Sequence, residues 1–139
     1  MFVSVWSDVA GKWADEEIRA FPYNSLNEYF DRSIILQDVI VDPQRIVGSD
    51  HPRYSGVPWR NMLSTGKRIS NNIRRYNENS DYFGTVRQPN SNYDHWTLAQ
   101  IGEDYYICEG NHRSLIAKYL AHENAMRSQI IPKVIRILS

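Results

Sequence analysis

The spacing of apolar residues changes at Gly110, and this change constrains the fold more than any other feature of the sequence. Residues 105–109 show the period of two that is typical of a strand. Apolar residues within 115–120 instead recur about every 3.6 positions, as in a helix. Glycine tolerates a sharp turn and lets a ligand approach the backbone closely. The sequence therefore predicts a strand, a tight turn and the start of a helix.

The residues that follow this turn have the chemistry to bind an anion. Asparagine, at position 111, is a preferred helix cap, and the first turn of a helix presents unpaired amide N–H groups at its positive end. Histidine and arginine add side-chain donors, and a planar guanidinium matches two phosphate oxygens. We therefore predict a nucleotide-phosphate site formed by Gly110, Asn111, His112, Arg113 and Ser114.

A plain structural role for the same residues is the alternative. A Gly-Asn cap can simply begin a helix, with Arg113 paired to Glu109 or Asp104. These five residues are not accompanied by a second motif elsewhere in the sequence. Their spacing therefore fits both a phosphate site and a plain helix cap.

A phosphate site with a metal ion such as Mg²⁺ also needs carboxylates. The candidates are Glu109, Asp42 and Asp50, each of which also suits a capping or solvated position. Four histidines without a repeated metal-ligand spacing predict no zinc site, and the metal ligands stay unassigned.

Histidine titrates near neutrality, so a histidine beside a phosphate is a candidate general acid or base. His51 lies in a loop rich in proline and glycine, together with Asp50, Arg53 and Tyr54. Functional side chains tend to lie on such loops, although a surface histidine is the plainer interpretation. The predicted catalytic set is Glu109, His112, Asp42 and His51.

Composition narrows the class of protein. The 139 residues suit one domain, and 42% of them are hydrophobic, as in an ordinary globular protein. The single cysteine, Cys108, excludes an internal disulfide and a multi-cysteine zinc site. No basic leader or run of roughly 20 apolar residues is present, so we expect a cytoplasmic protein without a membrane partner.

Sixteen basic and sixteen acidic residues cancel, which argues against nonspecific nucleic-acid binding. The charges are unevenly distributed, because residues 1–42 are mainly acidic and residues 45–77 mainly basic. The stretch from Arg60 to Arg75 is therefore the candidate DNA contact.

The remaining patterns predict an α+β fold with a small mixed sheet flanked by helices. Turn residues and β-branched runs define the strands, and the residue before Pro22 ends a short helix. The expected helices are 14–20, 59–63, 69–76 and 111–124, and the expected loops are 47–58 and 82–94. The expected strands are about 38–41, at the end of the β-branched run 33–41, and 95–101, 105–109 and 130–137. Residues 95–109 are expected to form a hairpin, and Pro132 to interrupt the last strand near its start.

Residues 105–118, YYICEGNHRSLIAK, resemble the second conserved box of the ParB/sulfiredoxin-like superfamily. In that box an apolar strand ends in a glycine, polar or basic residues follow, and a helix begins. ParB-type proteins carry Gly-Glu-Arg-Arg and bind a nucleoside triphosphate, whereas nuclease-type and free-serine-kinase-type members carry Asp-Gly-His-His-Arg, which Glu109 to Arg113 resemble most. Residues 39–45 are similar to the first box and 132–138 to the final strand.

The resemblance implies a single ParB-like domain, 1–139, with a divergent N-terminal extension at 1–35 and a core at 36–139. It implies binding of ATP or CTP, with hydrolysis or phosphate transfer, since phosphoryl transfer depends mostly on positioning and charge. Asn111 occupies the position of the attacking cysteine of sulfiredoxin, so sulfiredoxin chemistry is not expected. The helix-turn-helix module of partition proteins is missing from the pattern, so centromere binding is not expected either.

Two other functions stay open. A nuclease would track DNA with the basic stretch from Arg60 to Arg75 and act through the region of His112. A non-enzymatic phage or plasmid interaction module would bind a protein partner through aromatic residues, which are enriched at interfaces but also fill cores. The aromatic candidates are Trp6, Trp13, Tyr23, Tyr29 and Trp59.

Overall fold

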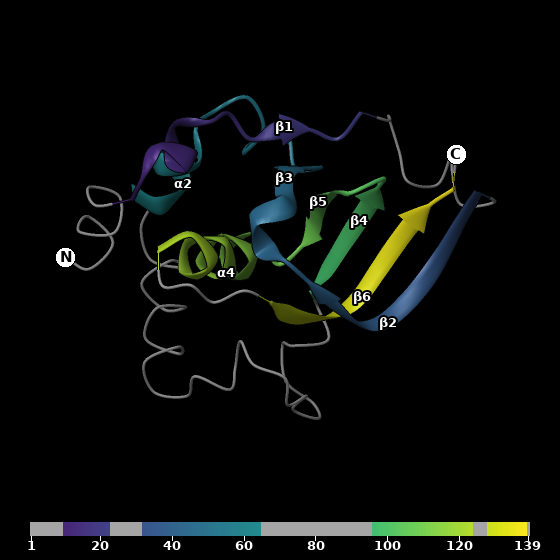
Figure 1. The fold of residues 1–139 in the computed structure, drawn as a ribbon. Helices are drawn as coiled ribbons and strands as arrows, with labels where there is room; N and C mark the ends of the chain where they lie inside the picture. The colour runs from purple at the N-terminus through teal and green to yellow at the C-terminus, as the bar shows by residue number, and fades with distance from the viewer. Residues whose placement is uncertain (1–9, 23–31, 65–95, 124–127, 139) are drawn as a thin grey trace.

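The computed structural model of the protein describes residues 10–22, 32–64, 96–123 and 128–138 (Figure 1). In this part of the chain six strands form one sheet in the order β1-β3-β5-β4-β6-β2, with both parallel and antiparallel neighbours. The predicted combination of helices with a mixed sheet is therefore confirmed. The strands are β1 (Arg19–Ala20), β2 (Ser33–Val41), β3 (Ile46–Ser49), β4 (Thr97–Ile101), β5 (Asp104–Glu109) and β6 (Gln129–Ile137), and the helical elements are η1 (Lys12–Asp15), η3 (Pro43–Arg45), α2 (Trp59–Ser64) and α4 (Asn111–Glu123).

The predicted hairpin forms the centre of the sheet. Strands β4 and β5 are antiparallel, and the turn between them contains Gly102 with a φ of +60°. Each of these strands has a parallel neighbour on its other side, because β5 pairs with β3 and β4 pairs with β6. Leu98, Ile107 and Val134 on these strands are fully buried.

Helix α4 covers one end of the sheet. It packs against β3, β5, η3 and α2, while β4, β6 and β2 extend away from it (Figure 1). The helical spacing found in the sequence places Leu115, Ile116 and Leu120 in the core, where all three are fully buried. The helices predicted at 59–63 and after Gly110 are thus confirmed as α2 and α4.

The predicted helix at 14–20 is wrong. A short 3-10 helix, η1, ends at Asp15, and the chain then extends into β1, which pairs with β3. The N–H of Ile18 donates to the carbonyl of Val57 at 2.8 Å, and the N–H of Gly56 donates to the carbonyl of Ile18 at 2.8 Å. These bonds to a distant loop replace those that a local helix would have made.

The predicted loop at 47–58 is also wrong at its start, because β3 occupies Ile46–Ser49. Gly48 suggested a break, but its φ is negative, so it needs no turn. A Cβ at this position would collide with the carbonyl oxygen of Arg19 and the ring of Tyr106. The glycine therefore allows β1 to approach β3 closely, and the loop itself is confined to residues 50–58.

Strands β2 and β6 form the far side of the sheet. Strand β6 is predicted correctly, whereas β2 begins at Ser33, five residues before the predicted start of its strand at about residue 38. The expected interruption at Pro132 does not divide β6, which continues from Gln129 to Ile137. The β2–β6 register is the same on both sides of Pro132, but no pair is formed at Pro132 itself, opposite Asp38. Asp38 has a φ of 52°, so the backbone is kinked there. The predictions at 69–76 and 82–94 lie outside the described residues. Among the described helices, none has the length and apolar character needed to cross a membrane.

Candidate functional site

The start of α4 lies where two parallel strands end. Strands β3 and β5 run side by side, so Ser49 and Glu109 end at the same edge of the sheet. Gly110 then turns the chain with a φ of +82°, and the N–H of Ser114 makes the first helical hydrogen bond, to the carbonyl of Gly110 at 2.8 Å. The amides of residues 111–113 precede that bond, so they project beyond the helix end.

Ser49 ties the loop after β3 to the start of α4. Its hydroxyl donates to Oδ1 of Asn111 at 2.7 Å and accepts from the N–H of His51 at 3.1 Å. The N–H of Asp50 donates to the carbonyl of Ile107 at 2.9 Å, which extends the strand pairing by one residue. Nδ2 of Asn111 donates to no side chain or carbonyl in the described part of the chain. The side-chain amide of Asn111 is thus held through its oxygen, and its nitrogen can donate to a ligand.

Three rings meet at this edge, and we call them the His51 cluster: His51, Tyr54 and His112. The ring of Tyr54 lies 4.9 Å from the ring of His51 and 5.8 Å from that of His112, edge to face with the latter. Nδ1 of His51 accepts from the N–H of Arg53 at 3.1 Å. A neutral His51 therefore carries its proton on Nε2. Two histidines predicted from separate parts of the sequence are thus brought together.

Two of the predicted carboxylates lie at the same edge. Partial burial raises the pKa of Asp50, although the neighbouring His51 and a hydrogen bond from Cys108 oppose this effect. The negative charge of Glu109 adds to the rise in the Asp50 pKa, so the two carboxylates are electrostatically coupled. Oε1 of Glu109 accepts from the hydroxyl of Thr97 at 2.7 Å.

Cys108 precedes Glu109 in the sequence, and the charges of both Asp50 and Glu109 affect the pKa of its thiol. Burial, reinforced by the charges of Asp50 and Glu109, raises the pKa of its thiol to about 12. A thiol with such a pKa stays protonated near neutral pH and is a poor nucleophile. Cys108 is therefore not suited to act as an attacking group.

The side chains of Arg113 and Ser114 face the interior. Arg113 is only 6% exposed, and its guanidinium lies over the indole of Trp96, 5.3 Å from the ring centroid. Nε1 of Trp96 donates to the hydroxyl of Ser114 at 2.7 Å. Of the predicted phosphate-binding residues, these two therefore contribute packing beneath the helix start, while Gly110, Asn111 and His112 are partly exposed.

Asp42, the third predicted carboxylate, is not brought to this edge. Its Oδ1 accepts from the N–H of Gln44 at 2.9 Å and caps η3. Nε2 of Gln44 in turn donates to the carbonyl of Ala121 at 3.1 Å. Asp42 therefore lies beside the last turns of α4, at the opposite end from His112.

Lys118 forms a buried structural centre in the second half of α4. Its Nζ donates to the carbonyls of Ile46 at 2.7 Å and Gln44 at 3.2 Å, and lies 5.1 Å and 5.8 Å from the ring centroids of Trp59 and Trp13. Burial lowers the pKa of this lysine to about 8. The hydrogen-bonded carbonyls offset part of the cost of burying the ammonium group.

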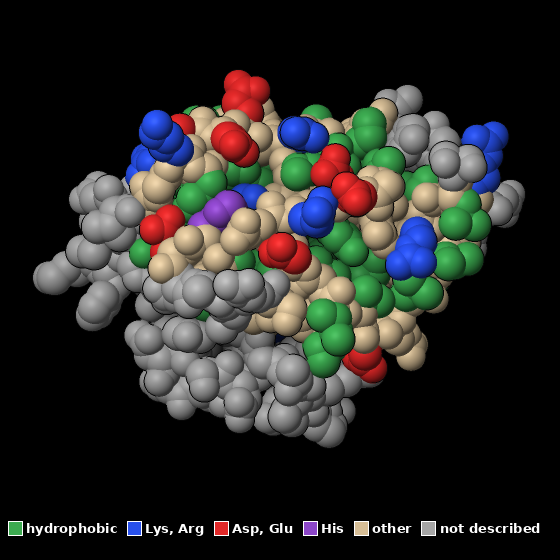
Figure 2. Space-filling model, in the orientation of Figure 1, with side chains coloured by type: hydrophobic (Ala, Val, Ile, Leu, Met, Phe, Trp, Pro, Cys, Tyr) green, Lys and Arg blue, Asp and Glu red, His purple; other side chains and the backbone are tan. Residues whose placement is uncertain are grey.

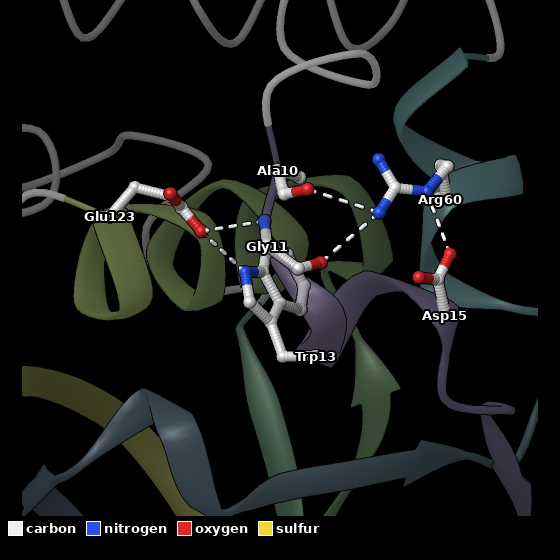
Figure 3. Close-up of polar contacts among 6 residues, drawn as sticks. All are labelled: Ala10, Gly11, Trp13, Asp15, Arg60 and Glu123. Atoms are coloured by element: carbon white, nitrogen blue, oxygen red, sulfur yellow. Dashed lines mark hydrogen bonds and ion pairs between the residues drawn. The ribbon is translucent and has the colours of Figure 1, made fainter.

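The end of α4 holds the N-terminal segment in place (Figure 3). Oε2 of Glu123 accepts from the N–H of Gly11 at 3.0 Å and from Nε1 of Trp13 at 2.7 Å. These two bonds lower the pKa of Glu123. The imidazole of His122 stacks on Trp13 with a centroid separation of 4.6 Å and an interplanar angle of 5°.

Arg60 holds the same segment from α2 (Figure 3). Its Nη2 donates to the carbonyls of Ala10 at 3.0 Å and Gly11 at 3.1 Å, and its Nε donates to Asp15 at 2.9 Å. The first residue of the predicted DNA-contacting stretch therefore has a structural role. The remaining basic residues of that stretch, 67–75, lie outside the described residues.

Sequence reasoning missed Ser49 and Trp96 as neighbours of the site. Ser49 lies in a segment predicted as loop, and it reaches Asn111 only because β3 pairs with β5. Trp96 adjoins Ser114 through the β4–β5 hairpin. The pairing of β3 with β5 has no local sequence signal, and the local signal for the β4–β5 hairpin does not indicate that Trp96 reaches Ser114. Across the described ranges, no three His, Cys, Asp or Glu side chains are grouped as metal ligands.

Comparisons with known proteins yield no relative from which a role for these residues could be transferred. No family model matches the chain, and neither a curated protein nor a solved structure resembles it significantly.

Proposed function

We propose that the chain is a ParB-like domain that binds ATP or CTP through its phosphates at the start of α4. The observation that carries the proposal is the meeting of the Gly110 turn with the His51 cluster at one edge of the sheet. Ligands of open sheets that mix strands and helices commonly bind at the carboxyl ends of the strands. The sequence resemblance of residues 105–118 supports the same assignment.

The phosphate contacts fall to the backbone and to His112. The amides of Asn111, His112 and Arg113 lie at the positive end of α4, which favours anions. The imidazole of His112 adds a side-chain hydrogen-bond donor to these amides. The buried side chains of Arg113 and Ser114 form the floor of the site and fix the position of these amides.

A divalent cation completes the proposed site. Asp50 and Glu109 would repel a phosphate that approached without one, since both carry negative charge at this edge. Mg²⁺ is commonly bound by one or two carboxylates together with the phosphates of the substrate. Phosphate hydrolysis or transfer would then use His51, whose exposed ring can exchange a proton through Nε2.

Isothermal calorimetry with ATP, CTP and inorganic triphosphate, each with Mg²⁺, tests the proposal. Triphosphate without a base separates phosphate recognition from base recognition. A hydrogen bond to a charged group contributes about 1.5–3 kcal/mol, so His112→Ala should weaken binding by about tenfold or more. His122→Ala is the matched control, because it removes an imidazole from the other end of the same helix.

Two results would overturn the proposal. The wild-type protein would bind none of the three ligands, or His112→Ala and His122→Ala would bind them with the affinity of the wild type. Binding that depends on Mg²⁺ and is reduced by Asp50→Asn would additionally place the cation between Asp50 and the phosphates.

A further inference from the structure

Strand β2 is the outermost strand at its side of the described sheet, and it is unusually apolar for an edge. Ile34, Ile35 and Ile40 on β2 are 40%, 49% and 70% exposed, and Leu138, which pairs with Arg32, is 47% exposed. These four are the large hydrophobic side chains that the described part of the chain exposes. Figure 2 shows hydrophobic side chains gathered on the side of the molecule where β6 and β2 lie.

The exposed isoleucines lie on both faces of the strand. Ile35 pairs with Ile135 and shares its face of the sheet, whereas Ile34 and Leu36 point to the opposite face. A partner that covered one face would leave the other exposed. A strand that paired alongside β2 would bury apolar surface on both faces at once.

The backbone of β2 is oriented for such pairing. The N–H of Leu138 donates to the carbonyl of Arg32, so Arg32 directs its carbonyl towards β6. Backbone groups alternate in direction along an antiparallel strand. The N–H and C=O of Ile35 and Gln37 therefore point to the outer edge.

The sequence of β2 complements itself in one antiparallel register, which has Ile35 opposite Ile35. In that register the apolar Ile34 faces Leu36, and the positive Arg32 faces the negative Asp38, twice each across the axis. Cross-strand pairs of both kinds stabilise antiparallel sheets. The net charge of zero opposes association of two copies less than a large net charge would.

We propose that two copies of the chain pair through β2, antiparallel across a two-fold axis at Ile35, and join their sheets into one. A two-fold interface requires the same surface to fit itself, which this register satisfies. We place the end of the ladder at Asp38, whose φ of 52° departs from the extended backbone of a regular strand. The site at the start of α4 lies near β3 and β5, so the dimer leaves it open.

Cysteine cross-linking tests the register directly. In a Cys108→Ala background, Ile35→Cys places two cysteines opposite each other with Cα atoms about 5.5 Å apart, a separation that a disulfide spans. Ile40→Cys, on the same exposed strand, is the matched control. Its two copies would lie about 33 Å apart along the strand. We expect mild oxidation to yield a covalent dimer from the first variant and monomer from the second.

Sedimentation analysis of the full chain tests the charge pairing. Arg32→Glu should weaken the dimer about tenfold, and the double variant Arg32→Glu/Asp38→Lys should recover affinity to within about twofold of the wild type. A wild-type chain that remains monomeric at the highest attainable concentration would overturn the proposal. Equal cross-linking of the two cysteine variants, or no recovery in a folded double variant, would overturn the register.

Discussion

The two ends of α4 are made of similar residue types but are organised differently. At the far end, Lys118 and Glu123 each have two hydrogen-bond partners, and Arg60 binds the N-terminal segment beside them. At the near end, His51 and His112 meet across Tyr54, and the helix amides project from the Gly110 turn.

This difference separates structural polar groups from candidate functional ones. Polar groups that satisfy one another stabilise the fold but have little left to offer a ligand. At the near end, the positive end of the helix and two histidines lie beside an exposed loop, where an anionic ligand can approach them. Substitutions at the far end should therefore reduce stability, whereas those at the near end should reduce binding.

The largest expected effect is at the far end, in Trp13→Ala. This side chain is 9% exposed, stacks on His122 and donates to Glu123, so its loss should lower the free energy of unfolding by about 3–5 kcal/mol. Denaturant titration provides the measurement. Tyr54→Ala, a partly exposed aromatic at the near end, is the control and should have a much smaller effect. Equal losses would remove the distinction between the ends.

The next largest effect is a pH dependence due to Lys118. Its pKa falls from 10.5 to about 8 on folding, so between these values the unfolded chain holds a proton that the folded chain has released. The contribution of Lys118 to stability should therefore rise with pH in this window, by on the order of 3 kcal/mol in total. Lys118→Met should abolish the rise. Lys133→Met, at an exposed position, should preserve it.

Cys108 acts in the opposite direction at higher pH. Its pKa rises from 9.0 to about 12 on folding, so the folded chain keeps a proton that the unfolded chain loses, and stability falls above pH 9. Between pH 8 and 9, the difference between the pH profiles of the wild type and Lys118→Met isolates the contribution of Lys118, because both proteins contain Cys108. If the wild type and Lys118→Met gave parallel pH profiles there, the buried ammonium would not have the role assigned to it.

A smaller effect is expected for Glu123→Gln. The pKa of Glu123 is lowered from 4.5 by the bonds from Trp13 and Gly11, so its stabilising contribution is present above that value and disappears as the pH falls. Glutamine keeps an acceptor but loses the charge, so stability near neutral pH should drop by about 1 kcal/mol and become less sensitive to acid. Glu103→Gln, in a surface pair with Arg45, should change little. Identical acid unfolding of the two variants would contradict this prediction.

The smallest effect on stability is expected at the near end. His112→Ala should change the free energy of unfolding by no more than about 0.5 kcal/mol, as for most partly exposed positions. His122→Ala should lower it more, because the stacked ring beside Trp13 is lost. Thermal unfolding of the two variants, measured alongside their triphosphate affinity, should show opposite patterns. Parallel changes in both properties would contradict a division of roles along the helix.

Local sequence patterns predicted the elements whose residues interact mainly with their neighbours in sequence. The hairpin around Gly102 and helix α4 follow from turn chemistry and apolar spacing. The segment 14–20 and strand β3 were missed because their hydrogen-bond partners lie far away in the chain. Long-range pairing overrides local propensity at such positions.

The candidate site was predictable only in part for the same reason. Gly110, Asn111 and His112 are adjacent in sequence, and His51 belongs to a loop with clear turn signals. That His51 and not Asp42 lies near His112 depends on the parallel pairing of β3 with β5, which no local pattern encodes. The inward direction of Arg113 depends on Trp96, which the hairpin positions.

The central claim is that the start of α4 binds phosphate, and titration of inorganic triphosphate with Mg²⁺ followed by amide NMR signals tests it most directly. The account predicts shifts concentrated in residues 50–54 and 110–113, with residues 118–123 unchanged. Shifts confined to other parts of the chain, or none at saturating triphosphate, would contradict it.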